Sequence, residues 1–394
     1  MTVPAHVPAD LVYTMDIRLD EELKKDPIDY LNNIARQFPN GIYYTPKNGG
    51  HWVISGYQAL CDAARTPDLF SSRKVNIPPV ESPYLLIPIN IDPPAHGKYR
   101  QAIAAGFSPA KMRDMEGYIR EFSINLIEAV KDKGGCDFVH AVAEPLPITI
   151  FMQLVGLPVS RLDEFRGWAM SALSDTDPAV RQECLEKIVG FMTQTIEERR
   201  VKRGKDMISD LFDATIDGRP LTMEEMQAYC LLFFLAGLDT VVNGMSFGVR
   251  HFAQHPELQQ QIRDNPEIIP AVVEEALRRY SFVNTARQVT RDCEFHGVQM
   301  KEGEMVMLCE AAADLDPEAF ANPLEFDITR KGVRHVAFNT GPHSCLGAHL
   351  ARIELGILYE EWCRRIPEFR IDENTPPEFV GGSVMGMRTL HLKW

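Results

Sequence analysis

The sequence predicts a mainly α-helical protein with a small β region, folded as one domain over residues 1–394. Of the 394 residues, 45% are hydrophobic and 24% are charged, which is the balance of an ordinary globular protein. No repeat, low-complexity tract or Gly/Ser linker divides the chain. A helical pattern runs from Pro109 to Ser209, broken at Gly134-Gly135, Pro158 and Pro178. Strand-like runs are short and late in the chain, at Glu294–Val298, Met305–Leu308 and Thr389–Lys393.

The overall charge argues against nucleic acid as a partner. The formal net charge is −14, and an acidic chain repels a phosphate backbone. The eight cysteines include no pair at Cys-x-x-Cys spacing, so we expect mostly reduced packing thiols rather than a zinc site of that kind. The N-terminus carries no signal-peptide pattern, and the longest apolar run, Leu231 to Gly237, is too short to span a bilayer. We therefore expect a cytoplasmic protein without a membrane segment.

The first quarter of the chain predicts a strand, a helix and then a long loop. Gly50–Ser55 alternates like a strand, and Tyr57–Arg65 returns to a helical pattern. Between residues 73 and 94 the prolines preclude a long helix, so we expect a loop with one short helical turn near Ser82–Leu86. Long ordered loops in compact domains are often binding loops.

A long helix is predicted in the middle of the chain. Thr222 and Glu225 form a capping-box pattern, and apolar residues continue to about Pro256, which gives a helix of roughly 30 residues. From Cys230 to Gly237 it is apolar on all sides, so it should run through the core. Gly237 would open space for a small ligand against the backbone, and Thr240 is expected to donate to the Ala236 carbonyl four residues back.

The loop from Phe338 to Gly347 leads directly into an amphipathic helix that extends to about Ile366. Cys345 therefore lies beside a helix N-terminus, where the amides of Leu346 and Gly347 and the helix dipole would favour a thiolate. Such a thiolate is suited to bind a metal or to act as a nucleophile. A lone cysteine in a turn is more often structural.

The spacing in this loop decides between these readings. It matches Phe-x-x-Gly-x-(Arg or His)-x-Cys-x-Gly at every defined position, and the chain therefore resembles the cytochrome P-450 family. Further runs resemble its bacterial camphor-hydroxylase branch: Gly49–Trp52, Ala143–Ile148, Gly237–Asn243 and Cys293–Gln299. The resemblance implies a haem b held between the long central helix and the cysteine loop, with Cys345 as the axial ligand of the iron.

The resemblance also implies roles for other residues. Glu275 and Arg278, spaced as Glu-x-x-Arg, would form a structural ion pair; the usual third partner would be an arginine where this chain has Glu325. Thr240 and Asp239 would assist catalysis by stabilising oxygen and relaying protons, in a groove beside Ala236 and Gly237. The other residues expected to hold the haem are Phe338 and Gly347 in the loop and, as propionate partners, His96, Arg100, Arg287 and His343.

By the same resemblance, Tyr84 falls where a tyrosine hydrogen-bonds a substrate ketone. The other expected pocket residues are mostly apolar: Leu86, Leu232, Leu235, Val283, Thr285 and Val384. This set suits a compact terpenoid, either camphor-like or an ionone-type norisoprenoid ketone. Leu85 and Thr285 each stand where that branch has an aspartate, and Asn76 stands where it has a pocket phenylalanine, so the pocket is expected to differ from one built for camphor.

The expected reaction is hydroxylation of a C–H bond with O2. The resemblance implies that electrons come from a [2Fe–2S] ferredoxin and its NAD(P)H-dependent reductase, because no such domain is encoded here. Candidate basic contacts for the ferredoxin are Lys98, Arg100 and Arg352. Two alternatives are a peroxide-driven peroxygenase and a haem- or terpenoid-binding protein without catalysis.

Overall fold

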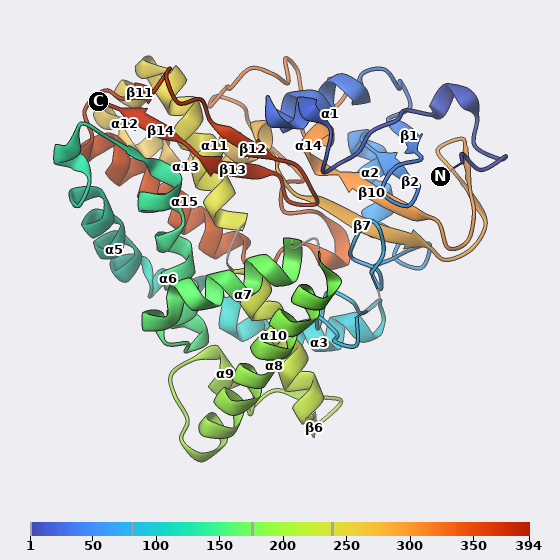
Figure 1. Ribbon diagram of the computed structural model, residues 1–394, viewed down its shortest axis with the longest axis horizontal. Coiled ribbons are helices and arrows are strands. Elements are labelled where there is room, and N and C mark those ends of the chain that lie inside the picture. Colours follow the sequence, from blue (N-terminus) through green and yellow to red (C-terminus); the bar gives the residue numbers. More distant parts are fainter. Residues whose placement is uncertain (1, 81, 175–176, 238–239) are drawn as a thin grey trace.

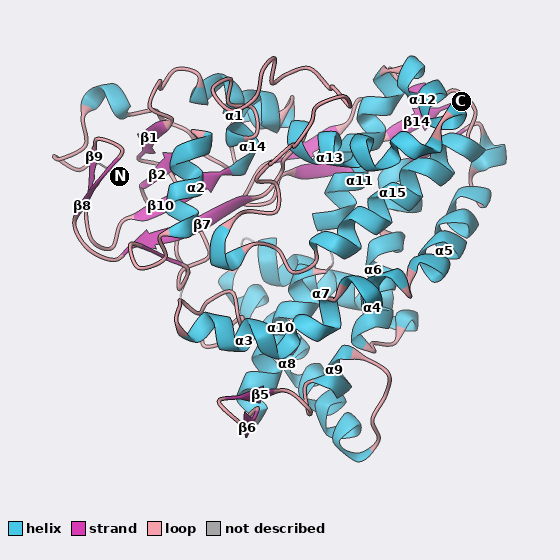
Figure 2. Cartoon of the chain, turned by 180° about the vertical axis from the view of Figure 1, so that it is seen from behind, coloured by secondary structure: helices cyan, strands magenta, loops and turns pink. Residues whose placement is uncertain are grey.

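The computed structural model describes residues 2–394 apart from 81, 175–176 and 238–239. Helices form most of it, and a β-rich layer lies along one side (Figures 1 and 2). The largest sheet has the strand order β1-β2-β10-β7-β3. Its strands are β1 (Ile42–Thr45), β2 (His51–Ile54), β3 (Phe70–Ser71), β7 (Asn284–Val289) and β10 (Met305–Cys309). Because β10 pairs with β2 in parallel and with β7 antiparallel, early and late parts of the chain meet in this sheet.

The remaining strands form small two- and three-stranded sheets. They are β4 (Gly135–Asp137), β5 (Thr215–Ile216), β6 (Arg219–Pro220), β8 (Cys293–Phe295), β9 (Val298–Met300), β11 (Arg370–Ile371), β12 (Glu378–Val380), β13 (Gly386–Thr389) and β14 (His391–Lys393). The predicted strands at 50–55 and 305–308 are confirmed as β2 and β10. The predicted run Glu294–Val298 is wrong as a single strand: it contains the turn of the β8–β9 hairpin, where His296 and Gly297 have φ of 47° and 79°.

The helices account for the predicted helical stretches. They are α1 (Pro27–Ala35), α2 (Tyr57–Arg65), α3 (Ala95–Ala104), α4 (Pro109–Arg113), α5 (Glu116–Glu128), α6 (Pro145–Val155), α7 (Leu162–Ser174), α8 (Pro178–Val201), α9 (Met207–Asp210), α10 (Met223–Ala236), α11 (Thr240–Gln254), α12 (Pro256–Asp264), α13 (Ile269–Arg279), α14 (Glu310–Ala313) and α15 (Ala348–Arg365). The predicted breaks hold, since Gly134 adopts a left-handed conformation before β4 and Pro178 begins α8.

The predicted central helix is described as α10 and α11, on either side of residues 238–239, which lie outside the described part of the chain. The capping box is confirmed, because the Glu225 amide donates to Thr222 Oγ1 at 3.2 Å and the Thr222 amide donates to Glu225 Oε2 at 2.8 Å. Gly237 ends α10 with φ −87° and ψ −3°. In the described part of the chain, one helical span has the length and apolarity of a membrane helix: Met223–Gln254, which runs across the undescribed residues 238–239. Of its apolar window, 62% is buried inside the protein. It therefore has the burial of a core helix.

The proline-rich segment is a loop, as predicted, but its turn lies later than expected. The Asn90 amide donates to the Leu86 carbonyl at 3.0 Å, and the Ile91 amide donates to the Pro88 carbonyl at 3.1 Å. Asn90 Oδ1 accepts a hydrogen bond from the Leu86 amide at 2.7 Å. The side chain of Asn90 thus fixes the turn after Leu86 instead of within Ser82–Leu86.

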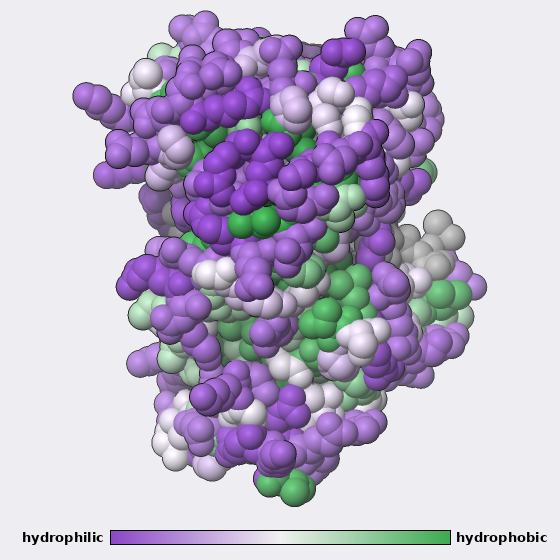
Figure 3. Space-filling model, turned by 90° about the vertical axis from the view of Figure 1, so that its left-hand side faces the viewer, coloured by the Kyte–Doolittle hydropathy of each residue, from purple (hydrophilic) through white to green (hydrophobic). Residues whose placement is uncertain are grey.

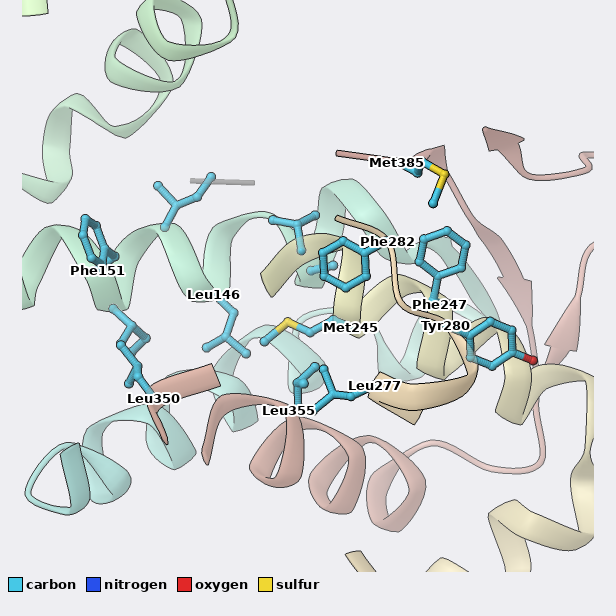
Figure 4. Close-up of a cluster of buried hydrophobic side chains, with 14 of the residues drawn as sticks. Leu146, Phe151, Met245, Phe247, Leu277, Tyr280, Phe282, Leu350, Leu355 and Met385 are labelled. Atoms are coloured by element: carbon cyan, nitrogen blue, oxygen red, sulfur yellow. The ribbon is translucent and has the colours of Figure 1, made fainter. Parts of the chain in front are cut away.

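The main hydrophobic core lies between the helices and the late strands. Figure 4 shows side chains from α6, α11, α13 and α15 packed together, among them Leu146, Met245, Leu277 and Leu355. The face in Figure 3 is mostly hydrophilic, with apolar residues gathered towards its middle. This core places the C-terminal half of the central helix against α15, the helix that follows the cysteine loop.

Candidate functional site

The cysteine loop follows a fixed path. The Cys345 amide donates to the Phe338 carbonyl at 2.9 Å, and Asn339 and Gly341 have φ of 57° and 74°. A Cβ at Gly341 would lie 2.6 Å from the Ala64 carbonyl oxygen on α2, so glycine is required for this close approach. The loop places Cys345 within one turn of the start of α15, as predicted.

The backbone amides next to Cys345 act on its sulfur. The amides of Gly347 and Ala348 favour the thiolate, so the predicted influence of Gly347 is present, and Ala348, where the helix begins, takes the place of Leu346. Burial raises the pKa of the Cys345 thiol, against the opposing effect of these amides and of Arg100. A coordinated metal ion would hold such a thiol deprotonated.

Several of the residues expected to border the haem are exposed or half-buried. The Cys345 side chain is accessible although burial affects its pKa. On α10, Ala236 is exposed while the preceding Phe233 and Phe234 are buried. Ala236 is thus an exposed residue at the end of a helix that packs against α7 and α8. Phe338 and Gly347 are half-buried.

The four predicted propionate partners lie together. The rings of His96 on α3 and His343 in the cysteine loop have centroids 4.1 Å apart. Burial, followed by the charges of His96, Arg287 and Arg100, lowers the pKa of His343 to about 3. Arg287 is 5% exposed, and burial lowers its pKa too. The structure therefore gathers cation-forming side chains from α3, β7 and the loop.

This cluster fits the haem that the resemblance implies. Among the described residues, the buried His343 Nε2 has no hydrogen-bond partner, and no ion pair reaches Arg287. Arg287 Nη1 donates only to the Ala286 carbonyl, at 2.7 Å. Buried, unpaired cationic groups require an anion, and the two carboxylates of a haem would supply it next to the cysteine that would bind the iron.

The predicted oxygen groove is changed in one respect. A Cβ at Gly237 would lie 2.2 Å from the Phe151 ring on α6, so the missing side chain gives space to this ring and not only to a ligand. Thr240 begins α11 and is half-buried. In the described part of the chain, no hydrogen bond joins its hydroxyl to the Ala236 carbonyl, so this predicted bond is not present. Asp239 lies outside the described residues.

The predicted pocket residues are partly brought together. Val283 and Val384 form an isolated antiparallel bridge, and Leu232 and Leu235 are half-buried on α10. Tyr84 and Leu86 are half-buried as well and pack against the main core, whereas Leu85 is 56% exposed. Among the described residues, the Tyr84 hydroxyl has no hydrogen-bond partner, so it is available to a ligand.

Thr285 has a partner that the sequence did not reveal. Its hydroxyl donates to Glu310 Oε1 at 2.7 Å, and its amide donates to Glu310 Oε2 at 3.1 Å. Glu310 follows the buried strand β10, and an acidic residue at the end of an apolar strand was the only available signal.

The ion pair of Glu275 and Arg278 is confirmed, and its third member is corrected. Arg278 donates to both carboxylate oxygens of Glu275, at 2.7 and 2.8 Å. Arg330, not residue 325, completes the network by donating to Glu275 Oε1 at 3.1 Å. Glu325 contributes only its backbone carbonyl, which accepts from Arg278 at 2.9 Å. The three-membered network is therefore intact.

Comparison with known proteins shows which family the chain belongs to. A family model described as cytochrome P450 matches residues 152–378. The chain is 34% identical over 401 residues to probable cytochrome P450 127A1 of Sinorhizobium fredii, covering 100% of this chain and 97% of that protein. It is 28% identical over 388 residues to linalool 8-monooxygenase of Pseudomonas putida, covering 93% and 95%. Among solved structures, it resembles CYP101J2 with a TM-score of 0.91 and 36% identity, covering 100% and 99%.

Proposed function

This chain belongs to the cytochrome P450 family, and from that premise we propose that it hydroxylates a C–H bond of a small apolar terpenoid with O2. A camphor-like monoterpenoid and an ionone-type norisoprenoid ketone are the two candidate shapes. The chain is a P450 monooxygenase of the camphor-hydroxylase-like branch with a haem-thiolate cofactor. The proposal concerns its substrate, its electron donor and the role of each residue.

The haem supplies the oxygen chemistry when it is bound. We assign Cys345 as its axial ligand, because it is the cysteine of the Phe338–Gly347 loop motif and the amides of Gly347 and Ala348 favour its thiolate. His96, Arg100, Arg287 and His343 would neutralise its propionates, because these buried and half-buried side chains lie around a ring nitrogen of His343 that has no partner among the described residues. Phe338, Gly347, Ala236 and Gly237 would border the ring, as the resemblance implies for the cysteine loop and the end of α10.

The substrate class rests on one observation: the half-buried Tyr84, which packs against the main core, has a hydroxyl without a hydrogen-bond partner among the described residues. Tyr84 would donate a hydrogen bond to a ketone, while Leu86, Leu232, Leu235, Val283 and Val384 would hold the hydrocarbon skeleton. Similarity to linalool 8-monooxygenase supports a terpenoid, since linalool is itself one. We assign Thr240, and Asp239 next to it in the sequence, to relay protons in the haem site.

A [2Fe–2S] ferredoxin and its NAD(P)H-dependent reductase would supply the electrons. The three basic residues predicted to contact the ferredoxin differ in whether their side chains already pair with an acidic residue. Lys98 Nζ lies 2.7 Å from Asp217 Oδ2, and Arg352 Nη2 donates to Glu274 Oε2 at 3.0 Å. Arg100 makes only a long contact of 3.4 Å to Ser344 Oγ. Lys98 and Arg352 would therefore have to exchange partners on docking.

The first test is a titration of the purified holoprotein with camphor and with an ionone, following the Soret band. A large shift to high spin with either ligand supports the terpenoid-ketone pocket, and the tighter ligand identifies the shape. A spectrum unmoved by both would refute this substrate class. In turnover, Thr240→Ala should consume NAD(P)H without hydroxylating; unchanged coupling would contradict the role of Thr240. Peroxide-driven turnover faster than ferredoxin-driven turnover would contradict the proposed donor.

A further inference from the structure

Glu310 connects two parts of the site through one buried carboxyl group. It begins α14 directly after β10 and is 1% exposed. Its oxygens accept hydrogen bonds from the hydroxyl and the amide of Thr285 on β7, at 2.7 and 3.1 Å. Asn339 Nδ2, in the cysteine loop, donates to Glu310 Oε1 at 3.1 Å. The carboxyl thus joins the predicted pocket strand to the loop that carries Cys345.

The hydrogens in this cluster can be assigned from its geometry. Asn339 Oδ1 accepts from the Thr340 amide at 2.6 Å, so its other side-chain atom is the NH2 group, which donates to Thr285 Oγ1 at 2.9 Å. A threonine hydroxyl has one proton and two lone pairs. While Glu310 is a carboxylate, that one proton is committed to Glu310 Oε1, and Thr285 offers no donor to anything else.

Protonation of Glu310 would reverse this bond. The Thr285 amide and the Asn339 NH2 group are donors and cannot accept a proton. A proton on Glu310 Oε1 therefore has one acceptor in the cluster, Thr285 Oγ1. The hydroxyl proton of Thr285 is then free to point elsewhere, and the Thr285 side chain is half-buried rather than fully enclosed.

We propose that the proton on Glu310 decides whether Thr285 offers a hydrogen-bond donor to the substrate. With Glu310 ionised, position 285 presents no donor and favours an apolar skeleton. With Glu310 protonated, Thr285 becomes a second donor, besides Tyr84, for a ketone or hydroxyl. Glu310 is thus a positioning residue that sets the polarity of the pocket. This inference rests on the proposed function, because it takes Thr285 as a substrate contact.

The surroundings of Glu310 allow it to change charge. Burial raises its pKa to about 8, and the hydrogen bonds from Thr285 and the charge of Arg287 oppose this rise. Cys309 precedes it in the chain, and Asp92 acts on Arg287 from the proline-rich loop. Three elements pack against α14, namely α1, α2 and β7. Their titratable or charged side chains, together with the one that follows α14 itself, are Asp29 and Tyr30 (α1), Tyr57, Cys61, Asp62 and Arg65 (α2), Arg287 (β7) and Asp314.

The first experiment needs no substrate. Infrared difference spectra of the holoprotein are recorded against pH for the wild type, Glu310→Gln and Thr285→Val, following the C=O stretch of a protonated carboxylic acid. We expect a band that vanishes as the pH rises through about 8 and is missing in Glu310→Gln. In Thr285→Val its midpoint should move to higher pH, because the carboxylate loses a donor. A midpoint unmoved by Thr285→Val, or spectra of wild type and Glu310→Gln that coincide at every pH, would overturn the inference.

The second experiment compares camphor with camphane, which has the same skeleton without the ketone, by Soret titration. In the wild type, the preference for camphor should fall about threefold to tenfold across this pH range, the worth of one neutral hydrogen bond. In Glu310→Gln it should not change with pH, because the glutamine amide donates permanently to Thr285. A pH-independent preference in the wild type would refute the role. If neither ligand moves the Soret band, the proposed substrate fails, and the infrared result alone decides on Glu310.

Discussion

Replacing Gly237 by alanine tests whether glycine is needed at this position to make room for the Phe151 ring or for a bound ligand. A Cβ there would lie 2.2, 2.3 and 2.5 Å from Cδ1, Cγ and Cε1 of the Phe151 ring, far inside contact distance. Phe151 is 8% exposed on α6, so the ring has little room to retreat. Overpacking of this kind costs about 1–3 kcal/mol. We expect Gly237→Ala to lower the free energy of unfolding by that amount.

Urea unfolding followed by far-UV circular dichroism measures this change for the two single variants, Gly237→Ala and Phe151→Leu, and for the double variant. If the Phe151 ring is the obstacle, replacing it by the smaller leucine relieves the clash. The double variant should then lose about 0.5–3 kcal/mol less unfolding free energy than the sum of the losses in the two single variants. Gly190→Ala is the control, because a Cβ at this α8 glycine meets nothing within 4 Å. It should be neutral or stabilising by up to about 1 kcal/mol.

Additive costs would refute the packing argument. If Gly237→Ala unfolds like the wild type but weakens binding of small haem ligands, the glycine serves the ligand, as the sequence alone suggested.

Four further predictions test other parts of the site. Cys345→Ser should remove the thiolate signature from the ferrous–carbon monoxide spectrum while far-UV circular dichroism stays unchanged; a retained signature would contradict Cys345 as the ligand. Arg330→Ala should lower the free energy of unfolding by about 1–3 kcal/mol, because it removes one hydrogen-bond donor from the buried Glu275. Glu325→Gln should change the free energy of unfolding by no more than about 0.5 kcal/mol. Equal effects of the two substitutions would refute Arg330 as the third member of the network. The hydrogen bond from Arg219 is the main influence that lowers the pKa of Glu225, to about 2. The ionised Glu225 therefore stabilises the fold at pH values above its unfolded pKa, and this stabilisation is lost as the pH falls from about 4.5 towards 2. Glu225→Gln should make the free energy of unfolding less dependent on pH in that window. Tyr84→Phe should weaken camphor binding about threefold to tenfold and leave camphane unchanged; an equal loss for both would mean that the ring, not the hydroxyl, contacts the ligand.

The features that the sequence predicted are those whose signal is local. The capping box of Thr222 and Glu225, the helix at Tyr57–Arg65 and the loop before Cys345 each lie within about ten residues, and short-range hydrogen bonds and glycine geometry determine them. The contacts that it missed join distant segments. Arg330 reaches Glu275 because the chain after β10 returns past α13, and Glu310 reaches Thr285 because β10 pairs with β7 in one register, with Leu308 opposite Thr285. Neither loop path nor strand register can be read from one sequence.

The cluster of His96, His343, Arg100 and Arg287 explains why this site should order around its cofactor. Without an anion, these groups repel one another, and that repulsion adds to burial in lowering the pKa of His343. Cationic groups buried close together destabilise the fold unless bound carboxylates neutralise them. Haem binding would supply these carboxylates and a metal ion for the desolvated Cys345 at the same time. The free energy of haem binding should therefore appear as stability of the fold, most strongly where α3, β7 and the cysteine loop meet.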